Sequence, residues 1–364
     1  MKICFLIGIK LVMKNSFFTN KLLEWNKKSN SRQMPWKNEP DPYKIWLSEI
    51  ILQQTRVEQG WNYYNNFIKH YPNVQKLSKA DDNEVFKLWE GLGYYNRCKN
   101  LLSTARYIAT ELSGVFPKTY EEVLSLKGVG PYTASAIVSF AYGLPYAVVD
   151  GNVTRVLSRF FGIKTPIDST KGKEEFNTLA QQLLDKKQAG KYNQAIMDFG
   201  ATICKPKSPL CNSCYLSEEC YAYNKNKIND LPQKLKSIKI KERWFYYLVL
   251  INKNKVYVKK RMDRDVWQNL HEFVLINEET DQQLKEADVI KKIHSKFSSN
   301  TINLVKASDF YKQKLTHQTI NCKFLILEIK KQEKLDGGEW VDKTQMKKLA
   351  FPKVIVNYMN QEFD

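Results

Sequence analysis

Four cysteines within seventeen residues constrain this 364-residue chain more than any other feature of its sequence. They follow the spacing C-x6-C-x2-C-x5-C and are Cys204, Cys211, Cys214 and Cys220. Four thiolates in one short loop suit either a tetrahedral zinc ion or a cubane iron–sulfur cluster. Zinc modules usually bring two C-x2-C pairs together from a distance, whereas this loop has one such pair between two single cysteines. The spacing therefore favours a [4Fe-4S] cluster that clamps the loop, without requiring a redox role.

The remaining cysteines, Cys4, Cys98 and Cys322, are scattered along the chain. Clustering of the other four indicates a metal site in a reducing compartment rather than a disulfide framework, so we expect a cytoplasmic protein. The longest uncharged run, Thr133–Val149, contains two serines, a glycine and a proline and is too short to span a membrane. We interpret residues 1–12 as an upstream extension rather than a signal peptide, because no small-residue cleavage site follows.

The charge balance narrows the class of partner. The chain has 57 Lys and Arg against 38 Asp and Glu, a formal net charge of +19. Such a field favours polyanions such as nucleic acid or an anionic membrane surface, and it indicates no particular fold. An apolar content of 43% is ample for packed cores, which excludes disorder as the main state, and the length suggests two domains.

The apolar period changes along the chain. Residues 13–223 have mostly helical spacing interrupted by Gly and Pro turns, and this predicts an all-α domain. Residues 224–242 are polar and lysine-rich, as expected of a basic linker. Residues 243–364 combine strand-like runs, at 244–258 and 321–329, with two helical stretches, at 289–297 and 344–349, and are predicted to form a smaller α+β domain.

Two sequence features in the first domain can carry chemistry. The run Leu126–Ala134 places Gly128 and Gly130 at a turn that opens a helix, where backbone amides can approach a phosphate; the alternative is an ordinary helix end. The predicted helix 43–57 has an apolar stripe with Glu49 at its edge, where partial burial would raise the pKa of a carboxyl. The alternative for Glu49 is a surface ion pair.

Together these features identify a resemblance. The Gly-Val-Gly turn between helices, Val149–Val153 and the four-cysteine loop look like the helix-hairpin-helix DNA glycosylases, and Met34–Trp36, Trp46–Val57 and Gly91–Tyr95 closely resemble motifs of the MutY-type adenine DNA glycosylases. The similarity runs from about Phe18 to the C-terminus and is dense only in the first domain. It implies a glycosylase domain with an iron–sulfur loop at 204–220, followed by a Nudix-like domain that recognises 8-oxoguanine.

The resemblance also implies roles for four residues. Glu49 would be the general acid, because adenine leaves poorly unless a ring nitrogen is protonated. Asp150 opens a predicted helix, so it can accept N-cap hydrogen bonds that keep it ionised, and an ionised carboxylate can stabilise an oxocarbenium-like sugar. Tyr132 and Asn152 would assist Asp150. Bifunctional relatives have a nucleophilic lysine where this chain has Tyr132, so we predict a monofunctional enzyme.

Further residues match the positions with which the family contacts DNA. An enzyme that acts on a base in a duplex must flip it out and fill the vacancy. Gln54, Leu92 and Tyr94 match the wedge positions, although core packing is the alternative for the last two. The remaining matches are Thr55, the glycines Gly128 and Gly130, and, in the second domain, Thr316 and His317.

The second domain departs from the family pattern at three positions. His271 stands where Trp is usual, Val274 where Pro is usual, and Leu315 where the family often has Phe. We find no Glu-rich Nudix catalytic box after Phe273, which favours recognition without pyrophosphate hydrolysis.

The sequence therefore predicts a monomeric base excision repair enzyme that acts on double-stranded DNA containing A:8-oxoguanine or A:G mispairs, without a membrane partner. Two alternatives stay open: a bifunctional endonuclease acting on oxidised pyrimidines, and a metal-stabilised DNA-binding protein without catalysis.

Overall fold

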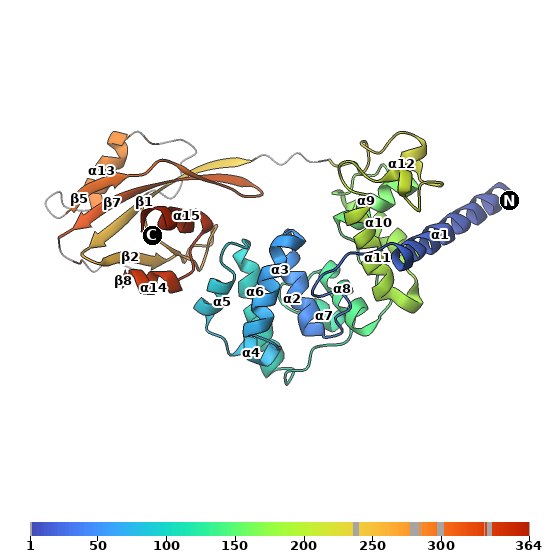
Figure 1. The fold of residues 1–364 in the computed structure, drawn as a ribbon, viewed down its shortest axis with the longest axis horizontal. Helices are drawn as coiled ribbons and strands as arrows, with labels where there is room; N and C mark the ends of the chain where they lie inside the picture. The colour runs from blue at the N-terminus through green and yellow to red at the C-terminus, as the bar shows by residue number, and fades with distance from the viewer. Residues whose placement is uncertain are drawn as a thin grey trace. The chain divides into compact units, whose positions relative to one another are not determined.

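A computed structural model of the chain describes residues 2–235, 240–276, 284, 286–296, 302–330, 332 and 337–363. It divides into two compact units (Figure 1). The helical unit consists of Met1–Ser78 and Ser103–Lys236, and the mixed unit consists of Lys79–Leu102 and Ser237–Asp364. Within the described residues, none of the helices combines the length and the hydropathy that crossing a membrane requires.

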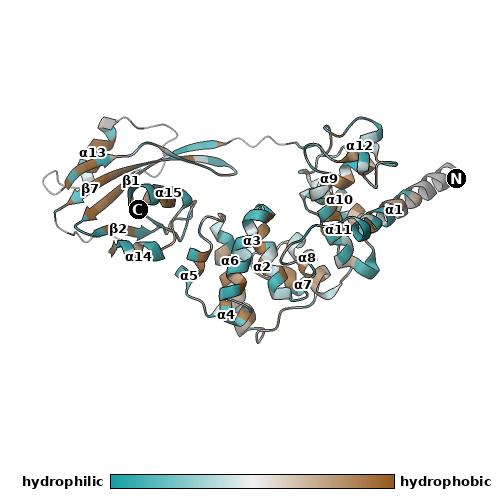
Figure 2. Cartoon of the chain, viewed as in Figure 1, coloured by the Kyte–Doolittle hydropathy of each residue, from teal (hydrophilic) through white to brown (hydrophobic). Residues whose placement is uncertain are grey.

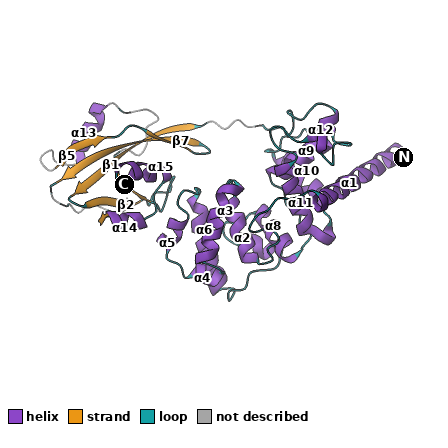
Figure 3. Cartoon of the chain, in the orientation of Figure 1, coloured by secondary structure: helices purple, strands orange, loops and turns teal. Residues whose placement is uncertain are grey.

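The described part of the helical unit contains no strand (Figure 3). Its elements are α1 (Lys2–Lys28), α2 (Pro42–Leu52), α3 (Val57–His70), α4 (Val74–Ser78), α7 (Tyr120–Ser125), α8 (Pro131–Tyr142), α9 (Gly151–Phe161), α10 (Thr170–Leu183), η1 (Lys186–Gln188), α11 (Ala189–Thr202), η2 (Cys211–Ser213) and α12 (Tyr221–Asn224). In its core, Phe18 and Trp25 of α1 pack with Phe160 of α9 and Phe199 of α11. This packing fixes α9, whose N-cap Asp150 and second residue Asn152 are two of the predicted catalytic residues.

The helix predicted at 43–57 is shorter in the structure. α2 ends at Leu52, and Val57 instead begins α3. The break falls at Gln54, whose φ of 57° lies in the left-handed region that a right-handed helix cannot continue through. The predicted apolar stripe is therefore divided between two helices, and Gln54 and Thr55 lie in the turn that joins them.

Residues 226–235 differ from the predicted linker, because they pack on the helical unit. Leu231 is buried, and its carbonyl accepts a hydrogen bond from the Arg159 guanidinium at 3.1 Å. The backbone NH of Ile167 donates to the carbonyl of Gln233 at 3.0 Å. Residues 236–239 of the predicted linker lie outside the described residues.

The mixed unit is built on one sheet. Its elements are α5 (Asp82–Leu88), β1 (Lys241–Asn252), β2 (Lys255–Lys260), β3 (His271–Glu272), β4 (Val274–Leu275), α13 (Glu286–Lys296), β5 (Ile302–Ala307), β6 (Tyr311–Lys314), β7 (Gln318–Ile329), β8 (Gly338–Asp342), α14 (Lys343–Lys348) and α15 (Lys353–Glu362). The helix α6 (Tyr95–Thr110) begins in this unit. The central strands β1 and β7 run parallel, the other pairs are antiparallel, and the path through the sheet is β3-β2-β1-β7-β5.

The side chains of alternate residues of β1 lie on opposite faces of the sheet. Tyr246, Leu248 and Leu250 pack with Val289 and Ile293 of α13. On the other face, the Tyr247 ring stacks on Phe324 of β7, and Phe324 stacks on Tyr358 of α15. Both faces of the central strands are therefore covered, which explains the hydrophobic stretches of β1 and β7 (Figure 2). The predicted fold class, a helical domain followed by an α+β domain, is confirmed.

Candidate active site

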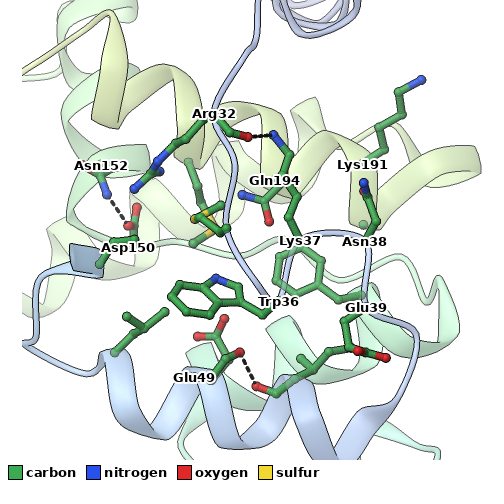
Figure 4. Close-up of a pocket in the computed structure, with 18 of the residues that line it drawn as sticks. Arg32, Trp36, Lys37, Asn38, Glu39, Glu49, Asp150, Asn152, Lys191 and Gln194 are labelled. Atoms are coloured by element: carbon green, nitrogen blue, oxygen red, sulfur yellow. Dashed lines mark hydrogen bonds between the residues drawn. The ribbon is translucent and has the colours of Figure 1, made fainter. Parts of the chain in front are cut away.

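A cavity of about 1000 Å³ opens within the helical unit, and we call it the central cavity. It is bordered by α2, α8, α9 and α11 and by the irregular segment between α1 and α2. Figure 4 shows the Glu49 carboxyl pointing from α2 toward the Trp36 ring, with Asp150 and Asn152 on the neighbouring wall. The structure therefore brings together the predicted catalytic residues, which are Glu49, Tyr132, Asp150 and Asn152.

Glu49 lies on the buried side of α2. The helix starts at the N-cap Asp41, whose side chain accepts a hydrogen bond from the Tyr43 backbone, and Trp46 and Ile50 anchor it in the core. Glu49 is only 6% exposed. Burial raises its pKa to about 7; a hydrogen bond with Tyr132 lowers it, and the nearby charge of Asp150 raises it further. Glu49 can therefore carry a proton near neutral pH.

Asp150 is the N-cap of α9, as the sequence predicted. Its Oδ1 accepts a hydrogen bond from the Val153 backbone NH at 2.7 Å, and its Oδ2 accepts one from the Asn152 amide at 2.7 Å. Desolvation raises the pKa of Asp150 above its usual value, while these hydrogen bonds lower it by stabilising the carboxylate. Asn152 thus fixes the orientation of the Asp150 carboxyl.

Tyr132 occupies the first turn of α8. The preceding turn contains Gly128, whose φ of 82° suits glycine, and Gly130 is the N-cap. Burial raises the pKa of the Tyr132 phenol well above its usual value, and the nearby carboxyls Glu49 and Asp150 raise it further. The phenol is therefore a neutral hydrogen-bond donor to Glu49.

The four clustered cysteines line one small cavity. Among the described residues, no three His, Cys, Asp or Glu side chains are arranged to hold a single metal ion. Four thiol donors around one cavity fit a metal centre of the kind that the cysteine spacing predicts. The Arg159 guanidinium donates to Cys204 Sγ at 3.6 Å and to the Lys205 carbonyl at 2.8 Å, which adds positive charge beside the thiolates.

Arg155 of α9 connects this loop to the central cavity. Its Nε donates to the Cys204 carbonyl at 2.8 Å, and its Nη2 donates to Asn152 Oδ1 at 2.8 Å and to the Gly200 carbonyl at 2.8 Å. Asn152 in turn donates to Asp150. A single guanidinium therefore holds both the first cysteine of the loop and the partner of Asp150.

The chain is similar to known DNA repair proteins. Residues 47–185 match the model of the HhH-GPD superfamily base excision DNA repair proteins, and residues 246–361 match that of the NUDIX domain. The adenine DNA glycosylase of Buchnera aphidicola subsp. Schizaphis graminum is 32% identical over 346 residues, which cover 93% of this chain and 96% of that relative. The chain belongs to the adenine DNA glycosylase family.

Two further proteins are similar to this chain over a shorter part of its length. The human adenine DNA glycosylase is 42% identical over 214 residues, which cover 56% of this chain and 39% of the human protein. A solved structure of a thermostable thymine-DNA glycosylase aligns with a TM-score of 0.55 and 30% identity, covering 59% of this chain and 99% of that structure.

The predicted DNA-contacting residues divide between the two units. Gln54 and Thr55 line the central cavity. Leu92 and Tyr94 belong to the mixed unit, where they line a groove of about 1010 Å³ together with Thr316 and His317; we call it the Tyr94 groove. The Tyr94 hydroxyl forms a hydrogen bond with the Thr316 hydroxyl.

Exposure distinguishes the two wedge candidates in the groove. Tyr94 is 43% exposed and has a φ of 50°, whereas Leu92 is only 6% exposed. Leu92 therefore has the burial that core packing predicts, and Tyr94 is the accessible ring. At the first departure from the family pattern, the buried His271 packs against Phe351 with ring centres 5.9 Å apart.

Sequence reasoning missed several residues of the central cavity. Arg32, Trp36, Lys37, Lys191 and Gln194 line it, but only Trp36 stood in a quoted motif and none was given a role. Arg32, Trp36 and Lys37 come from residues 30–37, which form no helix or strand. The available signal was the polar Asp198 in the otherwise apolar run of α11, because a buried carboxylate needs cationic partners.

Proposed function

We propose that this chain hydrolyses the N-glycosidic bond of adenine mispaired with 8-oxoguanine or guanine in double-stranded DNA. The observation that carries the proposal is the pair of carboxyls in one cavity: a buried Glu49 with a pKa of about 7 and a hydrogen-bonded Asp150 at a helix N-terminus. Paired carboxyls in different environments are typical of enzymes that break glycosidic bonds.

In this mechanism Glu49 supplies the proton. Its neutral carboxyl protonates a ring nitrogen of the extruded adenine, which makes the base a better leaving group. The bond between the sugar C1′ and the base nitrogen then breaks, and its electron pair leaves with adenine. Tyr132 holds the Glu49 carboxyl in place through their hydrogen bond.

Asp150 stabilises the sugar. Loss of the base leaves positive charge at C1′ and the ring oxygen, and an ionised Asp150 oriented by Asn152 offsets that charge. A water molecule then adds to C1′ and its released proton restores the Glu49 carboxyl, so the products are free adenine and an abasic site. The phenol of Tyr132 cannot form a Schiff base with the sugar, so we expect no efficient strand cleavage.

We further propose that the mixed unit reads 8-oxoguanine through the Tyr94 groove. The exposed Tyr94 ring can stack in the duplex, and the Thr316 hydroxyl beside it can hydrogen-bond a base edge. Replacing Thr316 by Ala should lower the preference for 8-oxoguanine over guanine about fivefold, the effect of one lost hydrogen bond. Thr316→Ser keeps the hydroxyl and should retain the preference; equal loss in both variants would contradict this role.

We propose that the four cysteines hold a [4Fe-4S] cluster in a reducing, cytoplasmic environment. When bound, the cluster would tie Cys204, Cys211, Cys214 and Cys220 into one rigid loop beside Arg159. Purified protein should be brown, with absorption near about 400 nm from thiolate-to-iron charge transfer. Colourless protein that contains zinc would contradict the assignment.

The function itself is tested by incubating the protein with duplexes that carry adenine opposite 8-oxoguanine, guanine, cytosine or thymine. We expect adenine release from the first two, with strand breaks only after alkali. Borohydride trapping of a covalent protein–DNA adduct would instead support the bifunctional alternative. If no duplex loses a base and Glu49→Gln changes nothing, the chain is a non-catalytic DNA-binding protein.

A further inference from the structure

Behind the central cavity, α11 carries a carboxylate that the mechanism does not use. The side chain of Asp198 is 0% exposed and has four hydrogen-bond donors. Its Oδ1 accepts from the Arg32 guanidinium at 3.0 Å and from the Gln194 amide at 2.9 Å. Its Oδ2 accepts from the Lys37 ammonium at 3.0 Å and from the Asn30 amide at 2.9 Å.

Three of these donors belong to segment 30–37, which lies more than 160 residues away in sequence. This segment forms no helix or strand, so side chains must supply much of what holds it. Lys37 also donates to the carbonyl of Arg32 at 2.7 Å (Figure 4), which links the two cationic residues of the segment to each other. Asp198 is therefore the point on α11 at which both ends of the segment are fastened.

The segment forms one wall of the central cavity. Trp36 lies between Arg32 and Lys37 in the sequence, and it is 9% exposed. Its ring packs against Tyr64 of α3, with ring centres 5.3 Å apart. Figure 4 shows this ring above the Glu49 carboxyl. A shift of segment 30–37 would therefore displace the Trp36 ring relative to the proposed proton donor.

The positive charges of Arg32 and Lys37 make the position of segment 30–37 depend on the negative charge of Asp198. Arg32 is 22% exposed and Lys37 is 15% exposed, so water screens the two cations from each other only partly. If the carboxylate is neutralised, the cations repel each other and two largely buried donors lose their ionic partner. An amide side chain has similar size but cannot offset that repulsion.

We propose that Asp198 is a positioning residue that holds segment 30–37 in place, so that Arg32, Trp36 and Lys37 form the wall against which the extruded base is oriented. The proposal rests on the proposed function, because it assigns a role in orienting that function's substrate. Asp198 itself contacts neither the base nor the sugar in this account.

The first test is single-turnover excision of adenine opposite 8-oxoguanine. Asp198→Asn should lower the rate about 100-fold, as expected when a wall of an active site is displaced by about 1 Å. Asp198→Glu keeps the charge and should restore the rate to within about tenfold of the wild type. Binding to undamaged duplex should stay unchanged, which a general loss of structure would not allow. Asp198→Asn with wild-type excision would overturn the proposal.

The matched control is Glu24→Gln. Glu24 also pairs with two cations, Lys21 at 3.2 Å and Lys28 at 2.8 Å, but all three lie on α1 and Glu24 is 35% exposed. Exposed pairs contribute little to stability. Excision by this variant should equal that of the wild type, and an equal loss in Glu24→Gln and Asp198→Asn would overturn the specific role of Asp198.

A second test does not depend on catalysis. Trypsin cleaves after Arg and Lys, and the Asp198 contacts shield Arg32 and Lys37. In Asp198→Asn, cleavage after these two residues should be at least about tenfold faster, because proteolysis follows the population of the open segment. Unchanged cleavage there would overturn the proposal. If the segment opens but the wild type releases no adenine, the proposed function fails while the fastening role stands.

Should Asp198→Asn fail to fold, Asn30→Ala provides the same comparison. It removes the hydrogen bond from Asn30 to Asp198, together with those that the Asn30 side chain forms with Asn26 and with the Arg32 backbone NH, and it leaves both ion pairs in place. Cleavage after Arg32 should rise at least about threefold, because the loss of even one hydrogen bond of ordinary strength has about that effect. A wild-type cleavage rate in a folded Asn30→Ala protein would count against the proposal.

Discussion

Two buried carboxylic acids, Glu49 in the central cavity and Asp198 behind it, have opposite surroundings. Glu49 on α2 has one hydroxyl partner, Tyr132, and a neighbouring acid, Asp150, so burial raises its pKa to about 7. Asp198 on α11 has two cations and two amides within 3.0 Å. Among the described residues, no cation contributes to the pKa of Glu49, which is ready to hold a proton, whereas four donors hold the Asp198 carboxylate in place. The difference teaches that the supply of partners, rather than burial alone, decides what a buried acid can do.

Replacing Glu49 by Gln should have the largest effect, because it removes the proton donor while keeping the size of the side chain. Adenine excision should fall at least about 10³-fold, within the range that general acid catalysis contributes. Affinity for the mismatched duplex should survive, as a gel-shift titration would measure. The control is Glu58→Gln in the exposed first turn of α3, which should excise adenine normally. Near-normal excision by Glu49→Gln would remove the distinction drawn between the two acids.

Asp150→Asn should have the second largest effect. Single-turnover excision should fall about 10²–10³-fold, because the sugar loses its stabilising charge. Asn is also a good N-cap, so the melting temperature should change little. The variant further sharpens the comparison, since removing the neighbouring charge should lower the pKa of Glu49. A large fall in melting temperature together with retained excision would indicate that Asp150 is only a cap.

Tyr132→Phe should have an intermediate effect. It removes the one hydrogen bond that lowers the pKa of Glu49, so that pKa should rise and the alkaline limb of the excision profile should move to higher pH. The rate below pH 7 should fall about tenfold, because the carboxyl loses its orienting partner. An alkaline limb that moves to lower pH would contradict the assigned hydrogen bond.

Lys37→Met should have the smallest effect. Asp198 would keep Arg32 and both amides, so segment 30–37 should stay fastened and excision should fall about threefold. In the Lys37→Met background, Asp198→Asn should lower the excision rate by a smaller factor than it does in the wild type, because only one cation then remains. If the double variant loses the product of the two single-variant factors in excision rate, the two residues do not act together.

Local patterns in the sequence predicted much of this site. The spacing of the cysteines identified the loop, and Asp150 before an apolar helical run predicted its N-cap role, because each signal lies within a few residues. Glu49 at the edge of an apolar stripe indicated a partly buried acid. The predicted catalytic roles came from the family resemblance, since an isolated Glu or Asp in such a place is more often structural.

Long-range contacts and local exceptions escaped the sequence analysis. The fastening of Arg32 and Lys37 to Asp198 joins residues more than 160 positions apart, and no period in the sequence reports such a pair. The early end of α2 depends on one residue, Gln54, in the left-handed region, which helical spacing does not indicate. Residues 79–102 read as part of the helical domain, yet they form one compact unit with the sheet.

The central claim, that a protonated Glu49 is the acid, is tested most directly by the pH dependence of single-turnover adenine excision between pH 5.5 and 9. The folded pKa of about 7 lies above the usual 4.5, so Glu49 is mostly protonated below pH 7 and loses its proton above it. The rate should fall about tenfold per pH unit well above pH 7, and Glu49→Gln should abolish this limb. A rate that stays constant to pH 9, or a limb that persists in Glu49→Gln, would contradict the account.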